Sequence, residues 1–238
     1  YLLEGYIVVI VDNTPEVLIL PSTIFQFTQS VDDYYKGPLV GTYFRLIRLL
    51  CILGSLFLMP VFLLLTTEFR EFSLNIKLLQ SADIQNYELL IYVLMMEFGL
   101  DLFRYSSAHT SSRYSGALSI VGGLIAGDVI IDLNWASAEV VFYAAITLLT
   151  TLSLSSYELG EAIRIYRLLL ILATGIFGIG GFVAGIILII ISVITTPSFA
   201  GKSFFWPLVP FNWSALKTLL FRYPTYRSQP GKVWSREK

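Results

Sequence analysis

The chain has 238 residues, of which 55% are hydrophobic and 14% are charged, and its mean hydropathy is +0.72. A soluble domain carries roughly 25% charged residues along its whole length, whereas here the charges cluster between long apolar runs, so the composition is not that of a soluble enzyme. The net charge of −1 gives no indication of a nucleic-acid partner. We therefore expect the lipid bilayer to surround the apolar runs.

The single cysteine and the single histidine form no ligand pattern, so we expect neither a disulfide, nor a metal, nor another cofactor. The chain begins with Tyr1, and its first apolar stretch follows an acidic residue without a basic leader. We therefore expect this sequence to be the C-terminal portion of a longer protein.

A β-hairpin is predicted near the start of the chain, with arms at Tyr6–Val11 and Glu16–Leu20. The turn-forming cluster Asp12-Asn13-Thr14-Pro15 separates two β-rich apolar runs. The arms are too short to cross a membrane, and an isolated hairpin is marginally stable. We expect it to complete a sheet in a soluble region outside this chain. Residues 22–35 are expected to lie as an amphipathic stretch on the membrane surface.

Five apolar segments follow, and a membrane-spanning helix needs about 20 apolar residues. The segments are 49–67, 87–105, 115–133, 139–154 and 168–196. The predicted fold is an all-α polytopic membrane domain at 45–196 with four to five apolar helical segments. Residues 1–44 would be the end of the soluble and juxtamembrane region. Residues 197–238 would form a basic cytoplasmic tail. Its aromatic residues would form an interfacial belt, namely Trp206, Trp213 and Trp234 with Phe204, Phe205 and Phe211.

The distribution of basic residues predicts the orientation, because positive charges stay on the cytoplasmic side. The tail from residue 201 contains seven basic residues and one acidic residue. Five complete crossings would put this tail outside. Either the fourth segment does not cross fully, or the fifth bends at Gly178–Gly181 and returns. We favour an even number of complete crossings.

The second segment contains Glu97, Asp101 and Arg104, which share one helix face. A lone carboxylate inside a membrane costs about 2.5–3.5 kcal/mol on insertion scales, so a partner or water must offset the cost. One interpretation is an ion pair within or between helices, with Asp101 paired to Arg104. The other is a ring of carboxylates lining a cation pore, with Glu97 as the best candidate. Asp128 in the third segment is a further candidate for pore lining or for a hydrogen bond between helices.

Glycines of the third and fifth segments are candidates for helix packing or gating. Small residues spaced by four allow helices to approach closely, and packing is the favoured interpretation for the third segment. The candidates are Gly122, Gly123, Gly127, Gly178 and Gly181.

Residues 155–167 form an amphipathic stretch before the fifth segment. The simpler interpretation is a solvated face on which Glu161 pairs with Arg164. The alternative is an element that couples the soluble region to the membrane helices. The residues of this coupling element are Tyr157, Glu158, Glu161 and Arg164.

An ordered set of motifs resembles the GerA-type spore germination proteins, which comprise germinant receptor A subunits and the related stage V sporulation AF proteins. The motifs are Gly5-Tyr-Ile-Val-Val-Ile-Val-Asp-Asn-Thr-Pro15 with Val17-Leu-Ile-Leu-Pro21, Asp32–Asp33 with Tyr34–Tyr35, Arg45-Leu-Ile-Arg48, Met96-Glu97 with Asp101 and Arg104, Ser119-Ile-Val-Gly-Gly123 with Gly127, Ser156-Tyr-Glu-Leu159, and Pro207-Leu-Val-Pro-Phe211. One departure is Ser155, which stands where the family pattern has proline.

The resemblance implies a location and partners that the residue pattern itself does not give. It implies a multi-pass protein of the inner spore membrane in an endospore-forming bacterium. It implies a complex with a polytopic B subunit and a C-subunit lipoprotein. It also implies a homo-oligomer, a pentamer, that conducts ions when nutrients arrive. Two alternatives stay open at this point, a non-conducting scaffold for a nutrient-binding partner and a secondary transporter; we expect no enzymatic activity.

Overall fold

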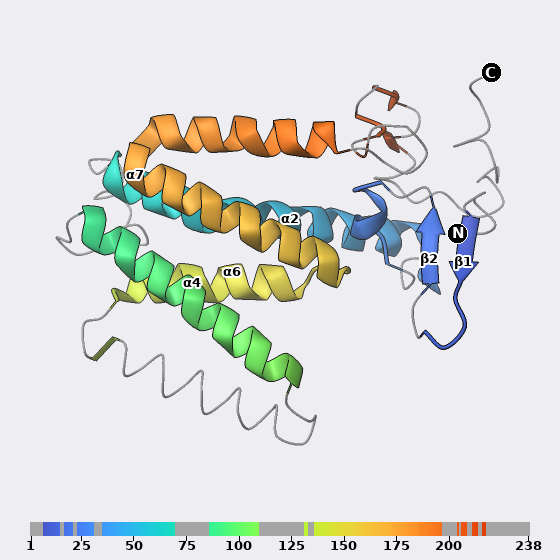
Figure 1. Cartoon of the computed structure of the whole chain (residues 1–238), viewed down its shortest axis with the longest axis horizontal. Coiled ribbons are helices and arrows are strands. Elements are labelled where there is room, and N and C mark those ends of the chain that lie inside the picture. Colours follow the sequence, from blue (N-terminus) through green and yellow to red (C-terminus); the bar gives the residue numbers. More distant parts are fainter. Residues whose placement is uncertain are drawn as a thin grey trace. The chain divides into compact units, whose positions relative to one another are not determined.

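The computed structural model describes residues 7–14, 17–20, 23–30, 35–69, 86–109, 131–132, 136–196, 204, 206–208, 211–213 and 216–217. The described part is mostly helical, with a small antiparallel hairpin and the helices α2, α4, α6 and α7 (Figure 1). The chain divides into two compact units, Tyr1–Leu50 with Leu188–Lys238, and Cys51–Ile187.

The predicted hairpin is confirmed. Strand β1 (Ile7–Ile10) pairs antiparallel with β2 (Val17–Leu20), so that Ile7 faces Leu20 and Ile10 faces Val17. Asn13 has a φ of 66° in the connecting turn, a conformation that asparagine tolerates better than most residues. The backbone N–H of Asn13 donates to the side chain of Asp12, which helps to fix this turn.

After the hairpin, the structure has a short 3-10 helix, η2 (Gln26–Thr28), within the predicted amphipathic stretch. The side chain of Gln26 accepts from the backbone N–H of Thr23, and the hydroxyl of Thr28 donates to the carbonyl of Phe25. These local bonds give residues 23–30 a compact conformation. Trp206, predicted for an interfacial aromatic belt, is buried, whereas Phe211 and Trp213 are exposed and stack on each other.

Helix α2 (Pro38–Thr67) is longer than predicted, because it begins at Pro38 instead of Leu49. Arg45 and Arg48 therefore lie inside the helix, not at its flank. Proline fits the first helical turn, where its missing N–H leaves no bond unmade. At 1.5 Å per residue the helix is about 45 Å long, which exceeds the bilayer core of about 30 Å.

Helix α4 (Asn86–His109) covers the second predicted segment. Its last residue is His109, so it extends beyond the end of that segment at Tyr105. The predicted third segment lies outside the described residues except for its last positions. Gly122, Gly123, Gly127 and Asp128 therefore remain outside the description as well.

Helix α6 (Ala138–Leu152) matches the fourth predicted segment and is capped by Ser137, whose side chain accepts from the N–H of Val140. Helix α7 (Tyr157–Thr195) joins the predicted coupling stretch and the fifth segment into one element. Two helices, α2 and α7, are long and apolar enough to cross a membrane, whereas α6 is shorter.

Helix α7 is interrupted at Gly178, which has φ 59° and ψ −137°. Beyond this residue the chain turns back along itself (Figure 1). A Cβ atom at Gly185 would lie 2.6 Å from Leu170, and one at Gly181 would lie 1.9 Å from the carbonyl oxygen of Ala173. Residues 170 and 185 would be about 22 Å apart in a straight helix, so the arm after Gly178 packs against the arm before it.

One apolar core lies within the unit Cys51–Ile187. All four helices contribute to it, and the ring of Tyr143 of α6 packs against it by stacking on Phe62 of α2, with ring centroids 4.4 Å apart. The buried members are Met59, Phe62, Leu63, Leu89, Val93, Ala136, Val140, Ala144 and Ile171. This packing holds the polar groups described next in fixed positions.

Candidate functional site

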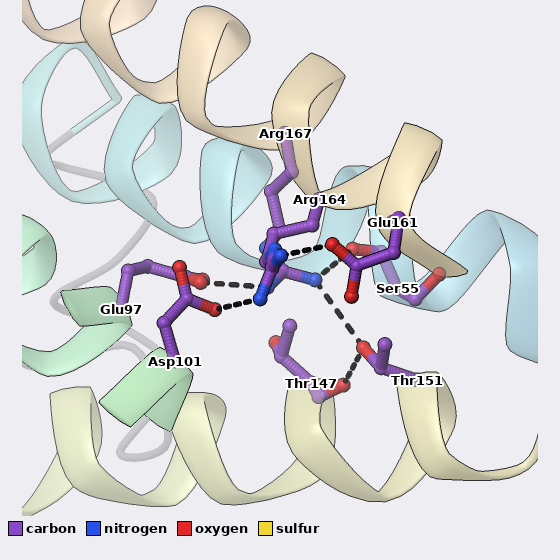
Figure 2. A network of polar contacts seen from close by, with 8 residues as sticks. All are labelled: Ser55, Glu97, Asp101, Thr147, Thr151, Glu161, Arg164 and Arg167. Carbon is purple, nitrogen blue, oxygen red and sulfur yellow. Dashed lines mark hydrogen bonds and ion pairs between the residues drawn. The ribbon is translucent and has the colours of Figure 1, made fainter. Parts of the chain in front are cut away.

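Arg167 of α7 lies at the centre of a polar network between the four helices (Figure 2). Its side chain is only 3% exposed. Its Nη2 atom donates to Oε2 of Glu97 at 2.7 Å, and its Nη1 donates to the carbonyl oxygen of Ser55 at 2.9 Å. A third contact joins Nη1 to the hydroxyl of Thr151 at 3.3 Å. One guanidinium thereby contacts α2, α4 and α6 from its place on α7.

Glu97 is completely buried, with 0% of its side chain exposed. A carboxylate in such a place needs an opposite charge or hydrogen-bond donors, because burial of an unpaired ion is very costly. Arg167 supplies both the charge and the donor. The structure therefore gives Glu97 an ion-pair partner within one chain, whereas its role in a pore stays a prediction.

A second ion pair lies beside the first. Nη1 of Arg164 is 3.2 Å from Oδ1 of Asp101, and the same guanidinium also pairs with Glu161. Asp101 follows Glu97 by one turn of α4, and Arg164 precedes Arg167 by one turn of α7. The pairs therefore form two rungs between antiparallel helices, the inner rung fully buried and the outer rung 22–24% exposed.

Buried hydroxyl groups complete the network on the side of α6. The hydroxyl of Thr151 donates to the carbonyl of Thr147 at 2.6 Å, and that of Thr147 donates to the carbonyl of Tyr143 at 2.8 Å. Both hydroxyls donate their hydrogen bonds to backbone carbonyls of their own helix. The lone pairs of the Thr151 oxygen therefore remain available to accept a hydrogen bond from Arg167. The threonines thus place an acceptor beside Arg167 without adding an unpaired donor.

Three atoms near this network have no hydrogen-bond partner among the described residues, namely Oε1 of Glu97, Nε of Arg167 and Nη1 of Arg104. Arg104, predicted to pair with Asp101, lies beside α7 instead, with its Nη2 3.7 Å from the position of a Cβ on Gly160. The ion pair that Asp101 forms among the described residues is with Arg164, and not with Arg104 as predicted.

The predicted coupling residues divide between the network and its edge. Glu161 and Arg164 form the predicted pair. Tyr157 and Glu158 lie exposed in the first turn of α7, where the hydroxyl of Ser156 bonds to Glu158 and accepts from the N–H of Leu159. Their coupling role remains a prediction.

Arg167 was expected on a solvated face, and that interpretation is wrong because the residue is buried. Ser55, Thr147 and Thr151 were not predicted as members of the site. The sequence did contain a signal for Arg167. It directly precedes a long apolar run, and a charge that enters the apolar part of a helix needs an oppositely charged partner at the same depth in the membrane. Nothing comparable marked the threonines, which are common in apolar helices.

Similarity to known proteins decides the family. The model of the Bacillus/Clostridium GerA spore germination protein family matches residues 1–231. The chain belongs to the GerA family. The resemblance of the motifs is thereby confirmed, and two of the residues in them, Glu97 and Asp101, are the carboxylates of the ion-pair rungs.

Individual GerA-family relatives are moderately similar. Stage V sporulation protein AF of Bacillus subtilis (strain 168) is 30% identical over 93% of this chain and 45% of its own length. Spore germination protein KA of the same organism is 30% identical over 100% of this chain and 44% of its length. The membrane protein YfkQ, also from that organism, is 26% identical over 97% of this chain and 46% of its length. The chain thus spans a little under half of these relatives, and no solved structure matches it.

Proposed function

We propose that this chain is the membrane part of a spore germinant receptor subunit, located in the inner spore membrane. Copies of it assemble as a pentamer into a nutrient-gated ion channel, in complex with a B subunit and a C-subunit lipoprotein. The observation that carries the proposal is the GerA-family match over nearly the whole chain. Relatives named for spore germination and for the membrane support it.

The buried network supports a multi-pass arrangement. Ionised groups are tolerated in a bilayer when they face one another inside a bundle, and Glu97 and Arg167 do so here. The bend at Gly178 supports an even number of crossings, because α7 leaves and returns. The basic tail then lies on the cytoplasmic side together with the start of α2, as the positive-inside rule favours.

A non-conducting scaffold is the second candidate function, and one observation favours it. Glu97, the first candidate for pore lining, is buried against Arg167 within a single chain, which is what a purely structural role requires. In the channel, other carboxylates must then line the pore. Asp101, whose side chain is 24% exposed, and Asp128 are the remaining candidates.

Conductance of the purified full-length oligomer in planar bilayers separates the two candidates. A channel gives discrete conductance steps that require nutrient and the partner subunits. A correctly assembled complex without any conductance contradicts the channel and leaves the scaffold.

Ion release from spores tests the lining residues. We expect Asp101→Asn to change the ion selectivity or rate of release at normal protein level, whereas Glu97→Gln acts by lowering the amount of assembled protein. Unchanged release in both variants removes the carboxylate-lining hypothesis.

A further inference from the structure

Residues 23–30 contact a segment that lies at the other end of the membrane domain in the sequence. The backbone N–H of Ile24 donates to the carbonyl oxygen of Phe204 at 3.1 Å. The rings of Phe27 and Phe204 have centroids 6.2 Å apart and are tilted by 50°. These contacts connect the segment before α2 with the segment after α7.

The same residues also contact α2. Nη1 of Arg48 donates to the carbonyl oxygen of Thr28 at 2.9 Å. Thr23 is only 3% exposed, which indicates a packed segment and not a solvated linker. We call residues 23–30, Arg48 and Phe204 the juxtamembrane cluster.

The juxtamembrane cluster joins three parts of the chain within one unit. Strand β2 ends at Leu20, shortly before Thr23. Arg48 lies in α2, and Phe204 follows the end of α7 at Thr195. A direct backbone hydrogen bond requires Ile24 and Phe204 to lie on one side of the membrane, because a bilayer core of about 30 Å cannot separate bonded atoms.

We propose that the juxtamembrane cluster is the coupling element of this protein: it transmits movement of the segment that follows the β-hairpin to α2 at Arg48 and to the segment after α7 at Phe204. The contacts carry the proposal, because a displacement of residues 23–30 must either move Arg48 and Phe204 or break their bonds. This role differs from the coupling role predicted for the first turns of α7, where Arg164 pairs with Asp101 of α4. The consequence for ion release rests on the proposed function.

The test uses the full-length protein carrying Cys51→Ser, Phe27→Cys and Phe204→Cys, treated with a short, reducible bis-thiosulfonate cross-linker. Mass spectrometry should find the peptides around 27 and 204 linked within one chain. Hydrogen exchange of the part of α2 around Arg48 should slow on cross-linking and recover on reduction. Nutrient-triggered ion release should fall about tenfold, within the range typical of coupled sites.

A matched control places the two cysteines at Tyr43 and Phe44, whose rings are 5.8 Å apart on α2 alone. Linking them should leave ion release unchanged. The proposal is overturned if folded protein yields no link between 27 and 204, or if the link leaves hydrogen exchange in α2 unchanged. If hydrogen exchange in α2 slows on cross-linking and recovers on reduction, but no ion release occurs even after reduction, the coupling is supported and the proposed channel is contradicted.

Discussion

At the residue scale, Arg167 is the cation that pairs with the buried carboxylate between the four helices. Its guanidinium is bonded to a carboxylate, a backbone carbonyl and a hydroxyl, each from a different helix. Removing one partner from a buried ion pair leaves an uncompensated charge, whereas removing both leaves none. The stability of the inner rung should therefore be strongly non-additive.

We expect Arg167→Met to lower the free energy of unfolding by about 3–5 kcal/mol, since Glu97 is left buried and unpaired. The double variant Glu97→Leu with Arg167→Met should recover most of this loss. Thermal unfolding of the protein in lipid nanodiscs measures both effects. A double variant no more stable than the single one would show that the charge pair is not the cause.

The outer rung provides the comparison. Asp101 and Arg164 are partly exposed, and such pairs contribute about 0–1 kcal/mol. Asp101→Asn should therefore hardly change the unfolding temperature. A loss equal to that of Arg167→Met would contradict the difference in burial between the rungs.

Thr151 tests the neutral part of the network. We expect Thr151→Val to cost about 1–3 kcal/mol, because Arg167 loses an acceptor that no water can replace easily. Thr195→Val is the matched control, since the hydroxyl of Thr195 is exposed and bonds to its own helix. Equal unfolding temperatures of the two variants would argue against a contribution from Thr151.

At the scale of the element, the turn in α7 depends on glycine at two positions. Gly178 has a positive φ that L-residues with a Cβ avoid. Gly181 faces the backbone of Ala173, which cannot move aside as a side chain can. Gly180 lies between them, and a Cβ there would meet nothing within 4 Å.

We expect Gly181→Ala to lower the free energy of unfolding by about 1–3 kcal/mol through overpacking. Gly180→Ala should be neutral or stabilising by up to about 1 kcal/mol, because alanine favours the helix. Protein level in membranes and unfolding temperature measure both. Similar behaviour of the two neighbours would show that the arms of α7 do not pack as described.

At the scale of the whole molecule, the turn in α7 and the bond between Ile24 and Phe204 each favour an even number of crossings. They lie in different units, so their agreement does not depend on how the units are placed. The excess of basic over acidic residues in the tail also favours an even number, because it predicts a cytoplasmic tail.

Sidedness can be measured with single cysteines in a Cys51→Ser background and a membrane-impermeant maleimide. We expect Lys36→Cys and Lys217→Cys to react from one side and Ile179→Cys, at the turn of α7, from the other. Reaction of positions 179 and 217 from the same side would contradict the return of α7.

Much of the fold could be predicted from local patterns. The turn residues around Asn13 predicted the hairpin, and apolar runs predicted the positions of α4 and α6. The start of α2 at Pro38 was not predicted, because Arg45 and Arg48 interrupt the apolar run, although a helix can continue through charges that find partners.

The site was predictable only in part. Glu97 and Asp101 were identified because charges in apolar segments are rare. Their partners were not, since Arg167 is 70 residues from Glu97 in the sequence and only tertiary packing brings them together. The sequence also did not predict that residues 157–195 form one helix. Basic residues in its first turns are typical of a membrane–water interface, and only their acidic partners on α4 show that they lie inside the helix bundle.

The hairpin shape of α7 also bears on biosynthesis. Its returning arm, from 179 to 195, measures about 25 Å, which is shorter than the bilayer core. An arm of this length gains little from integrating alone after release from the ribosome. Both arms should therefore leave the translocon together, already folded against each other. A substitution at Gly178 or Gly181 should then first show its effect as degradation of the nascent protein.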